Sequence, residues 1–179
     1  MNIHAGQPIQ SIKLRTSATH SDIDSVQQIL DSTGVFHPRE VAVALELLDD
    51  NLAKKGQSEY NFIFADLANQ QAVIGYICYG PITMTESGYD IYWIAVQRDM
   101  QRLGAASLLI EEAQRRITEA GGKFVYIETS TKDIYKPARE FYIKHGFLCT
   151  AIVPHYYAEN DNKAVFMKIV RQQFSMNKK

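Results

Sequence analysis

The sequence predicts an α/β fold: one mixed sheet of six or seven strands together with four helices. Two observations predict this fold. Strand-like and helix-like periodicities alternate along the whole chain, and a strand-helix-strand unit lies at its centre. The 179 residues contain no internal repeat and no Pro/Gly/Ser-rich linker. We therefore expect a single domain over residues 1–179, with loose termini at 1–10 and 171–179.

The first third of the chain reads as one strand and two helices. Apolar and polar residues alternate over residues 11–17, which is typical of a half-buried strand. Thr19 or Ser21 can cap the helix that follows. The second helix begins at Pro38, because the first helical position loses nothing by lacking a backbone N–H. Its apolar residues then recur every three or four positions for four turns.

The remaining elements follow from the same periodicities. Aromatic and β-branched residues mark three strands of an antiparallel meander, at 60–67, 72–79 and 89–96. Helical spacing returns over 103–120 and stops at two glycines. Strand 123–129, helix 137–145 and strands 147–153 and 164–170 complete the chain.

Composition excludes several classes of function. The 19 basic residues nearly cancel the 20 acidic ones, so the net charge of -1 provides no general attraction for nucleic acid. No apolar run approaches the ~18 residues that a membrane span needs, and no signal segment is evident, so we expect a cytoplasmic protein that does not bind membranes. The two cysteines stand far apart and the five histidines are scattered, so we expect no metal site.

The most informative segment joins strand 89–96 to helix 103–120 and includes the first helical turn. Its members are Gln101, Arg102, Leu103, Gly104, Ala105, Ala106 and Ser107. Small residues at 104–106 let a bulky anion approach the first helical turn, whose free N–H groups and positive dipole end favour phosphate oxygens. The patterns GxxxxGK[ST] and GxGxxG are absent, which disfavours ATP and dinucleotides. A turn without any ligand is the alternative interpretation.

Two motifs resemble those of the GNAT superfamily of acetyl-CoA-dependent N-acetyltransferases. The pattern Q-x-x-G-x-A at Gln101–Ala106 is similar to the pyrophosphate loop of the superfamily. Tyr142, followed by Gly146-Phe147, matches its next helix. The order of elements agrees along essentially the whole chain. The resemblance implies a GNAT-like fold whose strands 4 and 5, at 89–96 and 123–129, splay apart to admit the cofactor.

The resemblance also implies an activity, which is transfer of an acetyl group from acetyl-CoA directly to a primary amine of a small molecule, amino acid or peptide. Backbone groups of Ile94, Ala95 and Val96 would pair with the pantetheine arm, and Arg139 would offset cofactor charge. Tyr142 would protonate the departing thiolate. In the family an Asn commonly stands seven residues before that tyrosine, where this sequence has Tyr135. A non-catalytic acyl-CoA-binding sensor is the alternative, and a nucleotide-binding regulatory domain is a third.

Amine attack also needs a group that removes a proton. Glu128, near the end of its strand, is the first candidate, and Glu46 on the second helix is another. For both, an ordinary surface carboxylate remains the alternative. Five aromatic residues could line the acceptor pocket, namely Tyr89, Tyr92, Trp93, Tyr156 and Tyr157. Packing in the core or on the sheet surface is the alternative, and for Trp93 it is the main interpretation. His155 and Asp161, in a predicted final loop, are weaker candidates. The acceptor and the oligomeric state stay open, with a homodimer among the alternatives.

Overall fold

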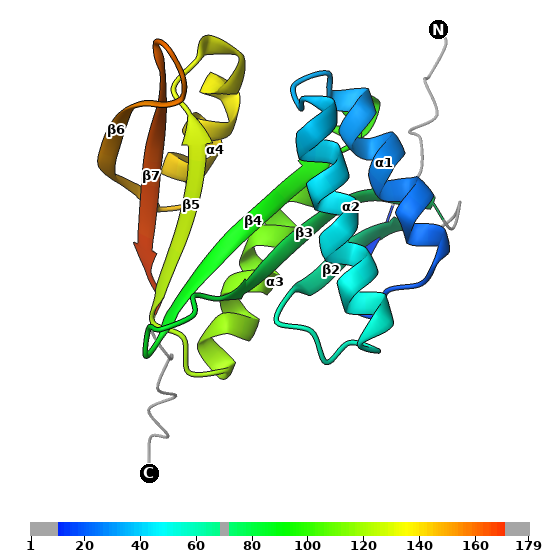
Figure 1. The fold of residues 1–179 in the computed structure, drawn as a ribbon. Helices are drawn as coiled ribbons and strands as arrows, with labels where there is room; N and C mark the ends of the chain where they lie inside the picture. The colour runs from blue at the N-terminus through cyan, green and yellow to red at the C-terminus, as the bar shows by residue number, and fades with distance from the viewer. Residues whose placement is uncertain (1–10, 69–71, 171–179) are drawn as a thin grey trace, which may run out of the picture.

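The computed structural model describes residues 11–68 and 72–170 (Figure 1). The predicted loose termini lie outside these residues, as does the turn at 69–71 that would connect the predicted strands 60–67 and 72–79. The described chain runs β1 (Ile12–Arg15), α1 (Ser21–Thr33), α2 (Pro38–Ala53), β2 (Asn61–Leu67), β3 (Ala72–Pro81), β4 (Gly88–Val96), a 3₁₀ turn η1 (Arg98–Met100), α3 (Ala105–Glu119), β5 (Phe124–Ser130), a 3₁₀ turn η2 (Asp133–Tyr135), α4 (Lys136–Lys144), β6 (Leu148–Ala158) and β7 (Asp161–Ile169).

The strands form one seven-stranded sheet in the order β1-β2-β3-β4-β5-β7-β6. Strands β4 and β5 pair in parallel, and the other neighbouring strands of the described sheet pair antiparallel. Helix α3 makes the crossover between the two parallel strands, as parallel pairing requires. The predicted mixed sheet and the four helices are therefore confirmed.

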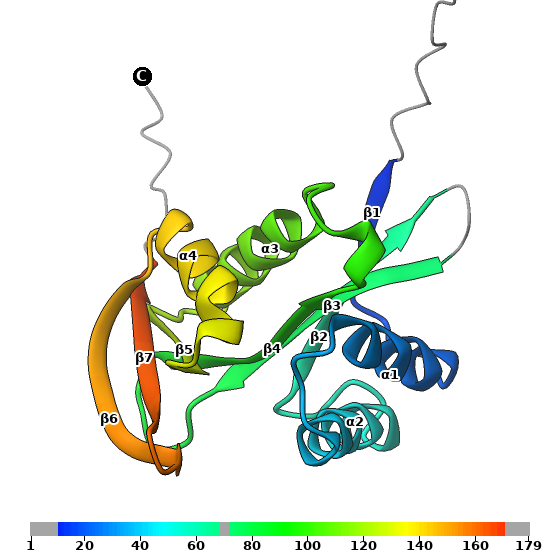
Figure 2. The same cartoon turned by 90° about the horizontal axis from the view of Figure 1, so that it is seen from above.

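Helices cover the two faces of the sheet unequally (Figure 2). We call the face under α3 and α4 the back face, and the opposite face, on which α1 and α2 lie, the front face. Alternate residues of β2 serve the two cores. Ile63 joins the back cluster with Leu109 of α3, and Phe64 joins the front cluster with Leu48 of α2. Helices α1 and α2 pack only over the half of the sheet that contains β2–β4, so the front face of β5–β7 carries no helix (Figure 2).

Strands β4 and β5 separate after a short stretch of pairing. Their register runs only from Gly88 opposite Phe124 to Ile91 opposite Ile127. A β-bulge lies just beyond, because Ile91 and Trp93 face consecutive residues of β3 and leave Tyr92 as the extra residue. A bulge bends its strand and increases the local twist. The predicted splay of strands 4 and 5 is confirmed, and the two strands diverge as a V (Figure 1).

The carboxyl-terminal hairpin differs from the prediction. Strand β6 extends to Ala158 and β7 begins at Asp161, so His155 and Asp161 lie in strands rather than in a long loop. The pairing of β6 with β7 jumps from Val153 to Ala158 across a register shift. The sequence analysis ended this strand at residue 153 because the next four residues bulge out of the ladder, and a bulge interrupts the period-2 alternation that identifies a strand.

The start of α1 also differs from the prediction. His20 occupies the N-cap position and makes no side-chain hydrogen bond to the helix. Thr19 instead donates its backbone N–H and its hydroxyl to the carboxylate of Asp22, at 2.7 and 2.9 Å. Asp22 is 1% exposed and forms an ion pair with Arg15 of β1. A buried carboxylate therefore fixes this helix start, in place of the predicted hydroxyl cap.

Candidate active site

The last residues of β4 leave backbone groups without a strand partner. The N–H of Gln97 donates to the carbonyl of Ile74 in β3 at 2.8 Å. Backbone groups in an antiparallel ladder alternate in direction, so Ala95 also faces β3, whereas Ile94 and Val96 face away from it. Pairing with β5 has already ended at that point. The N–H groups of Ile94 and Val96 therefore point into the gap between the diverging strands.

The loop after β4 turns sharply before α3 begins. Gln101 donates from its side-chain amide to the carbonyl of Val96 at 3.3 Å, which ties the loop to the strand end. Arg102 and Gly104 have positive φ angles of 66° and 91°. Gly104 is the N-cap of α3, and no side chain caps this helix start. The first-turn N–H groups of α3 are therefore free to bind an anion.

The space in front of this turn is open. A Cβ atom added at Gly104 would meet no atom within 4 Å, so the glycine is required by its left-handed φ and not by crowding from the protein. Leu103 is 51% exposed beside it, whereas Ala105 is buried against the sheet. Ala106 and Ser107 are half-buried. The hydroxyl of Ser107 lies 3.1 Å from Nε2 of His145, at the end of α4.

Arg139 has local partners. Its guanidinium donates to the carbonyls of Ser130 and Lys132, at 2.7 and 2.8 Å. These carbonyls end β5 and begin the turn into η2, so Arg139 holds the carboxyl end of β5 next to α4. Its predicted contact with the cofactor remains a prediction.

Tyr142 lies on the side of α4 that packs against the sheet. It is 7% exposed, and its ring makes an edge contact with Phe166 of β7 at 5.7 Å between centroids. Burial raises the pKa of the Tyr142 hydroxyl well above its usual value, with a further contribution from Tyr157. The hydroxyl therefore keeps its proton at working pH, as a general acid must.

A group that the sequence analysis missed lies where β4 and β5 part. Asp90 stands opposite Tyr126 in register, one pair before the two strands separate. Burial, together with the negative charge of Glu128, raises the pKa of Asp90 to about 6, while Lys163 opposes the shift. Such a carboxylate is poised to exchange a proton near neutral pH. The available signal was an acidic residue inside an otherwise aromatic and aliphatic strand.

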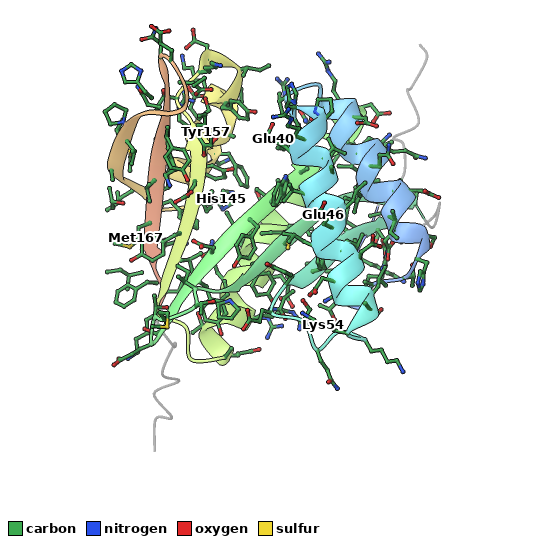
Figure 3. The ribbon with its side chains drawn as sticks, viewed as in Figure 1. Glu40, Glu46, Lys54, His145, Tyr157 and Met167 are labelled. Carbon is green, nitrogen blue, oxygen red and sulfur yellow. The ribbon has the colours of Figure 1, made fainter. Side chains whose placement is uncertain are left out.

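The two carboxylates predicted as bases lie in different surroundings. Both carboxylate oxygens of Glu128 accept hydrogen bonds from the Lys163 ammonium, at 2.9 and 3.0 Å, and the Glu128 side chain is 46% exposed. The Lys163 ammonium also lies 3.9 Å from the centre of the Tyr156 ring. Glu46 is exposed on α2 (Figure 3). Assignment of Glu128 or Glu46 as the base remains a prediction.

Tyrosine side chains lie beside the gap. Tyr156 and Tyr157 of β6 pack edge to face at 5.0 Å, and burial raises the pKa of Tyr157 to about 12. Tyr157 and Glu40 of α2 lie on opposite sides of the gap (Figure 3). Tyr135 of η2 donates its hydroxyl to the carbonyl of Val35, between α1 and α2, at 2.9 Å. Tyr135 thus joins the segment after β5 to the connection between α1 and α2, on the two sides of the gap.

Within residues 11–68 and 72–170, no cluster of three or more His, Cys, Asp or Glu side chains is arranged to hold a metal ion. None of the helices described is both long enough and apolar enough to cross a membrane.

A family model described as the acetyltransferase (GNAT) family matches residues 24–147. This span contains β4, the loop before α3, and Tyr142. A search of the curated proteins finds no match to this sequence.

Solved structures give the same picture. A putative GNAT-family acetyltransferase from Desulfovibrio desulfuricans is 34% identical, with a TM-score of 0.85, and the match covers 89% of this chain and 99% of that one. Two more distant structures share the fold. The ribosomal-protein-S18-alanine N-acetyltransferase of Escherichia coli is 16% identical over 94% of this chain and 100% of its own, with a TM-score of 0.70. An aminoglycoside 6'-N-acetyltransferase complexed with coenzyme A is 14% identical over 91% and 98%, with a TM-score of 0.69.

Proposed function

The chain belongs to the GNAT acetyltransferase family, and we propose that it moves an acetyl group from acetyl-CoA directly to a primary amine. The observation that carries the proposal is the junction of β4 and α3. There, two outward backbone N–H groups, at Ile94 and Val96, lead to an uncapped helix start behind Gly104. The distant relative complexed with coenzyme A supports the choice of cofactor class.

The residues at this junction fit coenzyme A. Free N–H groups at Ile94 and Val96 can pair with the amides of an extended pantetheine arm, as an added strand pairs with a sheet edge. The uncapped first turn of α3 can hold the pyrophosphate, since nothing from the protein fills the space in front of Gly104. Bound there, acetyl-CoA supplies the activated acyl group as a thioester.

Two proton-handling groups belong to opposite faces of the sheet. Asp90 lies on the front face where β4 and β5 part, and we assign it as the base that takes a proton from the acceptor ammonium. Tyr142 comes from α4 on the back face, and we assign its hydroxyl as the donor to the departing thiolate.

The front face is the approach that we propose for the acceptor. The helix-free half of the sheet presents Glu128, Lys163 and the tyrosines of β6 there, beside Asp90. Relatives of the same fold are named for acting on an aminoglycoside or on a ribosomal protein, so we propose an amine of a small molecule or a peptide. Cytoplasmic location and a homodimer remain predictions.

The proposal is tested by turnover. Purified protein is incubated with acetyl-CoA and a panel of primary amines, comprising diamines, amino sugars, amino acids and short peptides, and release of coenzyme A is followed. Release that requires an amine, with acetyl found on that amine, is the expected result. Binding of acetyl-CoA that raises the melting temperature without amine-dependent release from any acceptor would favour the sensor alternative. No binding at millimolar ligand would contradict the proposal altogether.

A further inference from the structure

His145 connects the two elements that matter most for the proposed reaction. It follows α4, which carries Tyr142, and its Nε2 lies 3.1 Å from the hydroxyl of Ser107 in the first turn of α3. No other side-chain hydrogen bond links α3 with α4 or its C-cap among the described residues. Packing restrains the imidazole at this contact, because the His145 side chain is only 11% exposed and the centre of its ring lies 4.4 Å from the centre of the Phe141 ring.

The backbone at His145 is also fixed. Its N–H bonds to the carbonyls of Phe141 and Tyr142, at 3.1 Å each, which closes α4. Lys168 of β7 donates to the His145 carbonyl at 2.7 Å and to Gln114 of α3 at 2.6 Å. The imidazole therefore has little freedom to leave Ser107.

We propose that His145 is a positioning residue for coenzyme A, which directs the Ser107 hydroxyl toward the pyrophosphate more firmly when the imidazole is protonated than when it is neutral. This inference rests on the proposed function, since it assumes that the first turn of α3 holds the pyrophosphate.

The direction of one hydrogen bond is the basis of the effect. A neutral imidazole can accept the Ser107 proton at Nε2, and the hydroxyl then has no proton left to offer to a phosphate oxygen. A protonated imidazole donates from both nitrogens, so Nε2–H must point at the Ser107 oxygen. The hydroxyl proton then turns outward, where it adds a donor to the free N–H groups of the helix start.

Charged groups around the imidazole determine where it titrates. Glu111 of α3 lies 4.0 Å from Nδ1, Lys144 stands next to it in α4, and Lys168 approaches from β7. Burial lowers the pKa of His145 below its usual value, Glu111 opposes this shift, and the two lysines add to it. The ring is therefore mainly neutral at pH 7 in the free protein.

The sign of the pH dependence follows from linkage. An anion bound at the start of α3 favours the charged imidazole, so binding raises the pKa of His145. Binding then takes up a proton at pH values between the pKa of the free state and that of the bound state. Affinity for coenzyme A should fall as pH rises through that interval and become constant above it.

The test measures the dissociation constant of coenzyme A by calorimetry from about pH 5 to about pH 8, the range in which histidines titrate. The phosphomonoester of coenzyme A also ionises near pH ~6, so the informative quantity is the difference between wild type and His145→Gln. Glutamine can keep a neutral hydrogen bond to Ser107 but cannot be protonated. We expect wild-type affinity to change by about fivefold more than that of the variant over this range. Identical pH profiles would overturn the proposal.

Two further variants locate the effect. Ser107→Ala should lose most of the extra pH dependence although His145 still titrates, and full retention would overturn the route through Ser107. His20→Gln removes an exposed histidine at the start of α1 and should match wild type. Equal melting temperatures of the variants show that each is folded. If wild type binds no coenzyme A at any pH, the proposed function itself fails, which is a different result from binding with an unchanged pH profile.

Discussion

The half of the sheet formed by β1–β4 and the half formed by β5–β7 are built differently. The first half is packed on both faces, by α1 and α2 in front and by α3 behind (Figure 2). The second half has α4 behind and no helix in front. Residues of β2 consequently alternate between two apolar cores, whereas Glu128 of β5 points to the uncovered front face and binds Lys163.

This difference shows where chemistry can be placed. A doubly covered strand has no polar face to offer, because both sides of it exchange water for apolar contacts. At the boundary, β4 is still packed against β3 but loses β5, so the backbone N–H groups of Ile94 and Val96 become available. Asp90 lies one pair before the point where the strands part. The covered half holds these groups still, and the open half leaves room for an acceptor.

The largest effect is expected from Asp90→Asn, which tests the chemistry proposed where the two halves of the sheet meet. Asparagine is similar in size but cannot accept the proton, so kcat/KM should fall by about 10²- to 10⁴-fold. The wild-type rate should also decline below pH ~6, because the pKa of Asp90 is raised to about 6 and only the ionised form acts as a base. That acid limb should be absent in the variant.

Asp49→Asn, which changes an exposed carboxylate on α2, should leave the profile unchanged. Glu128→Gln provides the decisive contrast. If it abolishes the acid limb while Asp90→Asn retains it, the base is Glu128, as the sequence analysis predicted.

The two-sided packing of the first half is tested by Leu48→Ala. Leu48 of α2 has no exposed surface, so the change should lower the free energy of unfolding by about 2–5 kcal/mol. Val153→Ala on β6, opposite Lys163 on the front face and 38% exposed, should cost only about 0.5 kcal/mol. Urea denaturation measures both. Equal losses would mean that the front face of the second half is covered in solution, for example by a second copy of the chain.

Tyr142→Phe tests whether the hydroxyl that α4 supplies from the covered back face donates a proton to the departing thiolate. The ring contacts with Phe166 remain, and only the hydroxyl is lost. Because a thiolate can also leave unaided, we expect a loss of about 10²-fold, the lower end of the range for general acids. A single turnover with acetyl-CoA bound beforehand separates the chemical step from product release. Transfer at the wild-type rate would show that the hydroxyl is structural.

Gly104→Val should have the smallest effect, confined to cofactor affinity. A branched side chain at a φ of 91° is strained and would stand where the pyrophosphate is expected, so affinity should fall by about tenfold or more. Gly121→Val is a matched control at the other end of α3. Its φ is 87°, and an added Cβ there also meets nothing within 4 Å. The same loss of affinity in both variants would attribute the effect to helix strain and place the phosphate elsewhere.

Local sequence by itself determined the succession of elements. Helix α3 was predicted at 103–120 and is observed at Ala105–Glu119, because apolar spacing and a terminal glycine pair are local signals. Pro38 likewise predicted the first residue of α2. The loop that we propose to hold the pyrophosphate, Gln101–Ser107, could also be identified from the sequence, since a helix start and small residues are properties of a short segment.

Other features depended on contacts that no local pattern encodes. The capping of α1 through Asp22 needs Arg15 from a neighbouring strand, and the end of β6 depends on its partner β7. Asp90 became a candidate base only when β5 was seen to pair beside it and then diverge. His145 and Ser107 are 38 positions apart and meet because α3 and α4 lie on the same face. Periodicity specifies which side of an element is apolar, but proximity, burial and pKa arise from the neighbours that the folded sheet brings together.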